Sequence, residues 1–192
     1  MNREDLLADL SEYGPGDAKE SESLEWIRRF LAKPADPFAR ENPEGHIPAS
    51  AIVARPDGSA FLLLHHRKLG RWLQPGGHAE PTDASAYDAA LREAREETGI
   101  ADFVAPFGRA IFDVDVHPIP ERRGDPAHFH FDVRYLVTTA SPIDRAAAED
   151  ADRPMEWRSL ESARGSDADP SLLRALQKAR MMLAAAVPAG RA

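Results

Sequence analysis

Apolar residues recur at helical spacing near both ends of the chain. Two sets near the start predict two helices: Leu6, Leu7 and Leu10, then Leu24, Ile27, Phe30 and Leu31. A third set predicts a final helix: Leu172, Leu173, Leu176 and Leu183. The final helix is expected to begin at Asp169-Pro170, because proline is favoured at the first helical position. Three prolines follow the first two helices, so we expect a helical extension over residues 1–45, packed on a domain that spans 46–192.

The middle of the chain has patterns typical of strands. Two apolar runs flank Pro56-Asp57-Gly58-Ser59 and predict a β-hairpin. Apolar and polar residues alternate in AIFDVDV, residues 110–116, and in HFHFDVRYLV, residues 128–137, which predicts two strands. The segment MEWRSL, residues 155–160, predicts a further strand or the end of one. Strands interleaved with helices indicate an α/β or α+β fold.

One predicted helix, which starts near residue 85, gathers acidic residues on one side. Glu93, Glu96 and Glu97 share a face about 100° wide. Like charges at this spacing repel each other by about 0.2–0.5 kcal/mol per close pair. Ser85 is expected to cap the start of this helix, and Gly99 is expected to end it.

The other sides of this helix carry apolar and small residues. One set is expected to face the core: Tyr87, Leu91, Ala94 and Thr98. A second set lies next to the glutamates and predicts open room beside the carboxylates: Ala86, Ala89 and Ala90.

A bound divalent cation would offset the repulsion between the glutamates. Hard oxygen ligands suit Mg²⁺ or Mn²⁺, which bind one or two protein carboxylates together with water and substrate phosphates. The alternative is a solvated charged face with no ligand. The charge spacing alone leaves both interpretations open. Upstream, Gly76 and Gly77 would let the backbone bend sharply or approach a ligand closely.

Polar residues also alternate along the two predicted strands. The first strand carries Asp113, Asp115 and His117, and the second carries His128, His130 and Asp132. Residues two apart share one face of a strand, so these six side chains meet if the strands pair. Two interpretations are open: a polar substrate pocket or extra metal site, for which histidine suits Mn²⁺ or Zn²⁺, or the solvent face of an antiparallel sheet.

Composition limits the classes of function. The chain has 192 residues, of which 43% are hydrophobic and 29% charged, which is ordinary for a protein that buries a core. It contains no cysteine, which excludes disulfides, thiolate metal sites and a cysteine nucleophile. Its net charge of −8 without a long basic cluster argues against a nucleic acid polymer as partner, but not against a nucleotide. We expect a cytoplasmic protein that does not bind membranes, since neither a signal peptide core nor an apolar run of about 20 residues is present.

The segment GGHAEPTDASAYDAALREAREETGI, residues 76–100, resembles the Nudix box of the Nudix hydrolases. Its second half matches the family pattern in full from Arg92 to Ile100. The first half differs, because Asp83 stands where the family has glutamate and one extra residue precedes Arg92. We expect the extra residue to be absorbed between Thr82 and Ala86, so that Asp83 contributes to loop structure more than to metal binding.

The resemblance implies a Nudix-like α/β/α sandwich around a mixed β-sheet. It also implies metal-dependent hydrolysis of a small-molecule diphosphate, usually a nucleoside diphosphate linked to another group. Mg²⁺ or Mn²⁺ is the expected cofactor, with Glu93, Glu96 and Glu97 as its ligands. Arg92 matches the arginine that orients the glutamates, and Arg92, Glu93 and Glu97 are the expected catalytic residues.

Other roles are less specific. Gly76, Gly77 and His78 are expected to contact the substrate. The general base is open between a glutamate of the box and a distant glutamate such as Glu121 or Glu149. The identity of the substrate is open, as is the oligomeric state, a homodimer included.

Two other functions share this fold. One is a non-catalytic Nudix-like module that senses a nucleotide; the complete glutamate set favours an enzyme over it. The other is a diphosphate isomerase of the isopentenyl-diphosphate type, which relies on a catalytic cysteine that this chain lacks.

Overall fold

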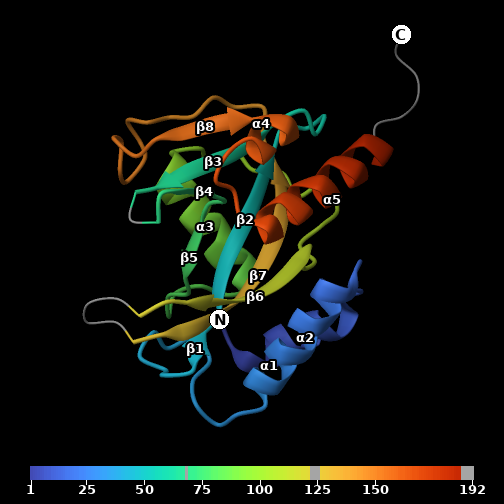
Figure 1. The fold of residues 1–192 in the computed structure, drawn as a ribbon, viewed down its shortest axis with the longest axis vertical. Helices are drawn as coiled ribbons and strands as arrows, with labels where there is room; N and C mark the ends of the chain where they lie inside the picture. The colour runs from blue at the N-terminus through green and yellow to red at the C-terminus, as the bar shows by residue number, and fades with distance from the viewer. Residues whose placement is uncertain (68, 122–125, 187–192) are drawn as a thin grey trace. The chain divides into compact units, whose positions relative to one another are not determined.

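The computed structural model describes residues 1–67, 69–121 and 126–186, which form a mixed α/β fold (Figure 1). The helices are α1 (Arg3–Glu12), α2 (Ala18–Leu31), α3 (Ala86–Thr98), α4 (Leu160–Arg164) and α5 (Pro170–Ala186). The strands are β1 (Gly45–His46), β2 (Pro48–Ala54), β3 (Phe61–His66), β4 (Arg71–Leu73), β5 (Gly76–His78), β6 (Asp113–Ile119), β7 (His128–Thr138) and β8 (Met155–Arg158). The sheet is mixed, since β1 runs parallel to β7 while β6 is antiparallel to it. The predicted fold class is confirmed.

The chain divides into two compact units. The first contains Met1–Ser50, Gly76–Arg92 and Arg109–Tyr135. The second contains Ala51–Pro75, Glu93–Gly108 and Leu136–Ala192. Residues 1–45 all belong to the first unit, and the Nudix-like segment contributes to both.

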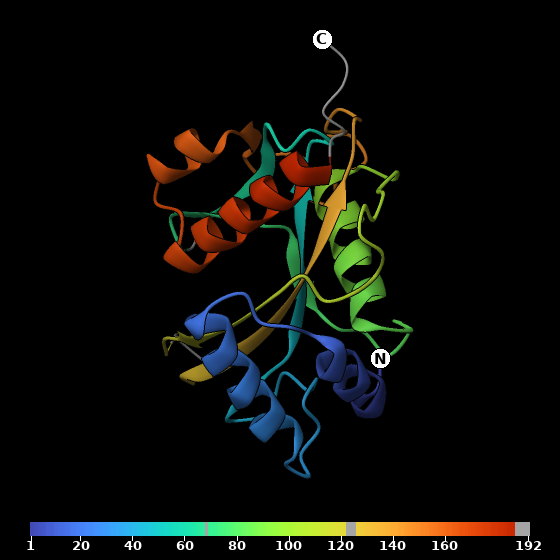
Figure 2. The same ribbon diagram turned by 90° about the vertical axis from the view of Figure 1, so that its right-hand side faces the viewer.

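In the first unit, the two predicted N-terminal helices are present and capped as their sequences suggest. Asn2 accepts a hydrogen bond from the backbone of Asp5 at the start of α1, and Asp17 accepts one from Glu20 at the start of α2. Their apolar faces are buried: Leu6, Leu10, Leu24, Ile27, Phe30 and Leu31. Helix α2 lies along β6 (Figure 2).

Two contacts join α2 to the strands of the first unit. The backbone N–H of Val116 donates to Ser23 Oγ over 3.2 Å. The ring of Phe30 stacks on that of Phe131, with centroids 4.0 Å apart and planes 7° apart. The helix is therefore tied to both β6 and β7 through packing and a buried hydrogen bond.

Strand β5 explains one of the two glycines that precede the box. Gly76 pairs with Ser50 of β2 and has a φ of +155°. A Cβ at this position would lie 2.5 Å from Ser50 Oγ, a distance that side chains do not tolerate. Gly76 thus serves a close approach between two strands, whereas the sequence suggested a sharp bend or an approach to a ligand.

In the second unit, the predicted hairpin is confirmed. Strands β2 and β3 are antiparallel with Ala54 opposite Phe61, and Gly58 in the turn has a φ of +70°. Strand β3 also pairs with β4 and with β8, which confirms the strand predicted around Met155. Helix α5 begins as predicted, because Asp169 Oδ1 accepts a hydrogen bond from the backbone of Ser171 over 2.8 Å.

Among the described residues, no helix combines the length and the apolar character required to cross a membrane.

Candidate functional site

Helix α3 has the boundaries that its sequence predicts. Ser85 Oγ accepts a hydrogen bond from the backbone of Asp88 over 3.1 Å, which caps the first turn. Gly99 has a φ of +70°, and a Cβ there would lie 2.0 Å from the carbonyl oxygen of Asp144. No side chain fits at this position, so the end of the helix, and with it the helical register of the glutamates, is fixed.

The core-facing side of α3 is also confirmed, because its predicted members are buried: Tyr87, Leu91, Ala94 and Thr98. The side with the small residues differs from the prediction. Ala86, Ala89 and Ala90 are 3% exposed or less, so this side is packed rather than open. The space around the carboxylates therefore does not come from these alanines. Glu93 and Glu97 are half-buried, and Glu96 is exposed.

In the first unit, Arg92 forms two hydrogen bonds with the carboxylate of Asp83. Its Nε donates to Asp83 Oδ1 over 3.0 Å, and its Nη2 donates to Asp83 Oδ2 over 3.1 Å. Nη2 also donates to the carbonyl oxygen of His78 over 2.9 Å. Asp83 Oδ2 accepts the backbone N–H of Glu80 over 2.7 Å as well. Asp83 thus positions both the loop and the arginine, and two parallel bonds fix the guanidinium plane.

The Asp83 side chain is buried, with an exposure of 5%. Burial alone would raise the pKa of Asp83, but the hydrogen bonds from Arg92 and from the backbone of Glu80, with the charge of Arg92, lower it overall. Asp83 is therefore an ionised partner of Arg92.

In the second unit, the glutamates meet the segment that leads to β8. Arg153 Nη1 forms an ion pair with Glu97 Oε1, and both side chains are less than one-fifth exposed. The backbone N–H of Glu149 donates to the carbonyl oxygen of Glu96 over 2.7 Å. No pattern in the sequence indicates Arg153, because its segment has neither periodicity nor a motif.

The two distant glutamates considered as general bases lie in different units. Glu149 is exposed and its backbone touches that of Glu96 in the second unit. Glu121 is exposed in the first unit, next to residues outside the described part. Of the two, Glu149 is the one whose backbone contacts the glutamate segment within a single unit.

The donor set on α3 fits a hard divalent cation. Carboxylate oxygens are the ligands that Mg²⁺ and Mn²⁺ prefer, and a bound cation would offset the repulsion between the three glutamates.

The polar residues of β6 and β7 form a buried charge network rather than a solvent face. Asp113, Asp115 and Asp132 are at most 2% exposed and surround Arg134, which is 3% exposed. Arg134 Nη1 lies 3.1 Å from Asp113 Oδ1, Nη2 lies 3.6 Å from Asp115 Oδ2, and Nε lies 2.8 Å from Asp132 Oδ2. Ser50 Oγ donates to Asp132 Oδ1 over 2.8 Å.

Arg134 is the member that the sequence analysis missed. Burial would lower the pKa of Arg134, but the three aspartates raise it, so the guanidinium stays charged. The solvent-face interpretation is therefore wrong for the three aspartates. Their observed partner is a guanidinium, which gives the two strands a buried ionic core. Arg134 stands two residues after Asp132, so the same alternation could have included it.

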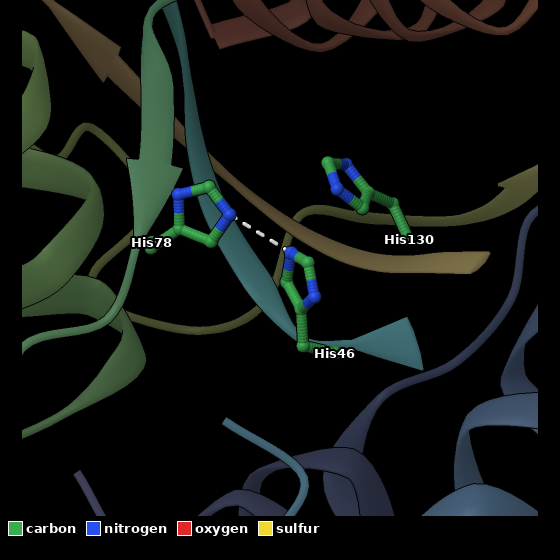
Figure 3. Close-up of side chains that lie close together, drawn as sticks. All are labelled: His46, His78 and His130. Atoms are coloured by element: carbon green, nitrogen blue, oxygen red, sulfur yellow. Dashed lines mark hydrogen bonds between the residues drawn. The ribbon is translucent and has the colours of Figure 1, made fainter. Parts of the chain in front are cut away.

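The histidines of these strands belong to a different cluster in the first unit. The rings of His46, His78 and His130 approach one another from β1, β5 and β7 (Figure 3). One nitrogen from each of the three lies within 4.8 Å of the others, and the Nε2 atoms of His46 and His78 are 2.8 Å apart. The rings of His117 and His128 lie 5.5 Å and 5.4 Å from that of His130.

Strand pairing creates this cluster. His46 is opposite His130 in the parallel pair of β1 and β7, and His117 is opposite His130 in the antiparallel pair of β6 and β7. His78 is opposite Pro48 of β2. Burial, and then the neighbouring histidines, lower the pKa of His130 to about 2, so its ring is neutral. Sequence alternation indicated His117, His128 and His130 but gave no reason to add His46.

The family comparison matches most of the chain. The model of the NUDIX domain family matches residues 45–178. No curated protein matches the chain.

Three solved structures are similar to this chain at low sequence identity, and the one with a TM-score of 0.50 shares its fold. The dihydroneopterin triphosphate pyrophosphohydrolase of E. coli is 15% identical, covering 71% of this chain and 95% of its own, with a TM-score of 0.50. An Ap4A hydrolase binary complex of C. elegans is 17% identical, covering 72% and 98% of the two chains, with a TM-score of 0.47. A bifunctional NMN adenylyltransferase/ADP ribose pyrophosphatase of Francisella tularensis is 22% identical, covering 84% of this chain and 43% of that one, with a TM-score of 0.43.

Proposed function

This chain belongs to the NUDIX domain family and is a hydrolase that acts on diphosphates, and we propose that it cleaves a nucleoside diphosphate linked to another group. The observation that carries the proposal is the face of α3 with Glu93, Glu96 and Glu97, inside the matched range and fixed in register by Ser85 and Gly99. The residues of this face are those expected to touch the metal and the substrate.

The proposed cofactor is Mg²⁺ or Mn²⁺, held by Glu93, Glu96 and Glu97. When bound, such an ion polarises a phosphoryl oxygen and lowers the pKa of a water molecule. A diphosphate is multiply anionic, so three glutamates would repel it unless their charge is compensated.

The chain's own residues supply orientation and charge. Arg92 keeps its guanidinium plane fixed on Asp83, and we propose that it orients the glutamates of the same helix. Glu93 and Glu97 are half-buried, which limits the rotamers of their carboxylates. We retain Gly77 and His78 of β5 as proposed substrate contacts, and Gly76 as the glycine that lets β5 approach β2.

Either Glu97 or Glu149 is the proposed general base. Glu97 lies on the helix face and carries an arginine partner, while Glu149 is held by its backbone next to Glu96. The two alternatives predict different effects of one substitution. Glu149→Gln should lower kcat by about a hundredfold or more if Glu149 is the base, and by little if it is not.

The test is a hydrolysis screen of the purified chain with Mg²⁺ or Mn²⁺. The panel includes Ap4A, ADP-ribose, dihydroneopterin triphosphate and other nucleoside diphosphate derivatives, with phosphate or nucleotide release as the readout. Glu97→Gln should abolish turnover, while Glu161→Gln, an exposed glutamate of α4, should leave it unchanged. Tight binding of a panel compound without turnover under either metal would instead identify a nucleotide-sensing module.

The cytoplasmic location and a homodimer are further parts of the proposal. Cell fractionation tests the first, and light scattering at the concentration of the assay tests the second.

A further inference from the structure

We propose that His46, His78 and His130 form a site for a divalent transition metal, Zn²⁺ in the first place, that is separate in its ligands from the glutamates of α3. The site lies wholly within the first unit. It rests on three imidazole nitrogens from three strands that lie within 4.8 Å of one another.

The spacing of the three nitrogens fits one ion. Around tetrahedral zinc, with Zn–N distances of about 2.0–2.1 Å, two nitrogens lie roughly 3.3 Å apart. The closest pair here, His46 Nε2 and His78 Nε2, is 2.8 Å apart, and the whole set lies within 4.8 Å. Small ring rotations therefore suffice to bring the three atoms onto one ion, and a fourth position stays open.

The chemical state of the rings also suits a metal. A ligating histidine must offer an unprotonated ring nitrogen. At 2.8 Å, the two Nε2 atoms of His46 and His78 share a single proton in the metal-free state when both rings are neutral. A cation placed between them would accept both lone pairs once the ring that carries the Nε2 hydrogen has changed to its Nδ1–H tautomer.

Two further histidines flank the three and have defined tautomers. His128 Nδ1 lies 2.8 Å from the carbonyl oxygen of Pro126, which can only accept, so Nδ1 carries the hydrogen. His117 Nδ1 lies 3.0 Å from Asp115 Oδ2, a buried carboxylate. In the neutral form of each ring the lone pair is then on Nε2, and a carboxylate behind a histidine raises its basicity as a ligand. These two rings provide candidates for the fourth position.

The ligand type separates this site from the glutamates. Imidazole nitrogen suits zinc, copper, nickel and iron, whereas carboxylate oxygen suits Mg²⁺ and Mn²⁺. The two sets of residues should therefore load with different metals from a mixture. A single protein would hold a hard cation on α3 and a softer one on β1, β5 and β7.

The test is calorimetric titration of the chelator-treated full chain with Zn²⁺ in the presence of excess Mg²⁺. The wild type should bind one zinc ion in this buffer. His130→Gln and His46→Gln should each weaken binding by at least about tenfold, since even the loss of a residue behind a ligand costs about that much. Two matched controls should bind as the wild type does: His65→Gln, whose ring packs on Trp72 in the second unit, and Glu97→Gln.

Several results would overturn the proposal. Equal zinc affinity in the wild type and in both cluster variants would place zinc elsewhere, and so would a loss confined to Glu97→Gln. An absence of zinc binding in the wild type would refute the proposal. Thermal unfolding of each variant in chelator checks the fold, and Co²⁺ absorption of the wild type gives a second readout, since tetrahedral nitrogen ligands produce intense visible bands. Hydrolytic activity enters none of these measurements, so a failed substrate screen leaves them unaffected.

Discussion

Glu97 of α3 and Arg153, which precedes β8, form an ion pair between two side chains that are less than one-fifth exposed. The arginine supplies positive charge at the carboxylate that the family pattern assigns to metal binding. If Glu97 binds the proposed metal ion, that ion and the guanidinium compete for its carboxylate.

Removing that competitor should strengthen metal binding. Arg153→Gln is expected to tighten Mg²⁺ binding about fivefold, because the ion no longer has to displace a guanidinium worth roughly 1 kcal/mol to Glu97. The same variant should unfold at a lower temperature in chelator and recover more of its stability than the wild type when Mg²⁺ is added. Calorimetry and thermal unfolding measure both effects. Weaker Mg²⁺ binding in Arg153→Gln would instead show that Arg153 holds Glu97 in its ligating position.

The second prediction separates Asp83 from the glutamates. Asp83 binds Arg92 through two hydrogen bonds and holds the backbone of Glu80, so its loss should loosen the arginine and the loop. Asp83→Ala is expected to lower kcat/KM by about tenfold, in the range typical of residues that support a ligand. Glu97→Gln should lower it by more than about a hundredfold, because it removes a group that touches the metal.

The comparison needs a control and a metal titration. Asp167→Ala replaces an exposed aspartate near α5 and should leave kcat/KM unchanged. Mg²⁺ affinity should fall in Glu97→Gln and stay near the wild-type value in Asp83→Ala. Equal losses of activity and of metal affinity in the two variants, with both folded, would make Asp83 a member of the metal site.

The third prediction concerns acid stability. Asp83 has a lowered pKa in the folded chain, and the unfolded value is the ordinary 3.8. Folding therefore favours its ionised form, so its contribution is fully present above the unfolded pKa and is lost as the pH falls through the folded pKa. The free energies of unfolding of the wild type and of Asp83→Asn, measured in urea, should differ at pH 7 and approach each other as the pH falls below 3.8 and through the folded pKa. A difference that stays constant down to low pH would mean that the ionised state of Asp83 contributes nothing.

Local patterns predicted the elements whose causes are local. The spacing of Tyr87, Leu91 and Ala94, with Ser85 before and Gly99 after, was enough to define α3. The hairpin at Gly58 and the start of α5 at Asp169 follow in the same way from turn and capping chemistry. The motif on α3 then indicated the family without any tertiary information.

Local patterns could not predict the contacts between segments that are far apart in the sequence. Alternation placed Asp113, Asp115 and Asp132 on one face but could not predict whether that face is exposed to solvent or buried. A buried arginine that pairs with the aspartates makes a polar face compatible with the protein interior. His46 joins His130 only through a parallel pairing of two strands far apart in the sequence. Arg153 reaches Glu97 from a segment without periodicity.

The last prediction tests whether residues 1–45 are an integral part of the folded chain. Phe30 of α2 is 3% exposed and stacks on Phe131 of β7 with ring centroids 4.0 Å apart. Phe30→Ala removes this aromatic contact and leaves a cavity, so it should lower the free energy of unfolding by about 3–5 kcal/mol. Leu7→Ala is the matched control in the same extension, since Leu7 is 37% exposed and should cost less than about 1 kcal/mol.

Limited proteolysis gives the second readout for this extension. If α1 and α2 are part of one cooperative unit with β6 and β7, the wild type should resist cleavage before residue 45 and unfold in a single transition. Phe30→Ala should become sensitive there, and its whole transition should shift to lower denaturant. One outcome would show that the extension folds apart: a protease trims residues 1–45 from the wild type and the remaining chain keeps its unfolding temperature. An extension that packs on the sheet cannot be lost without exposing Phe131 and Val116, and that exposure would lower the unfolding temperature.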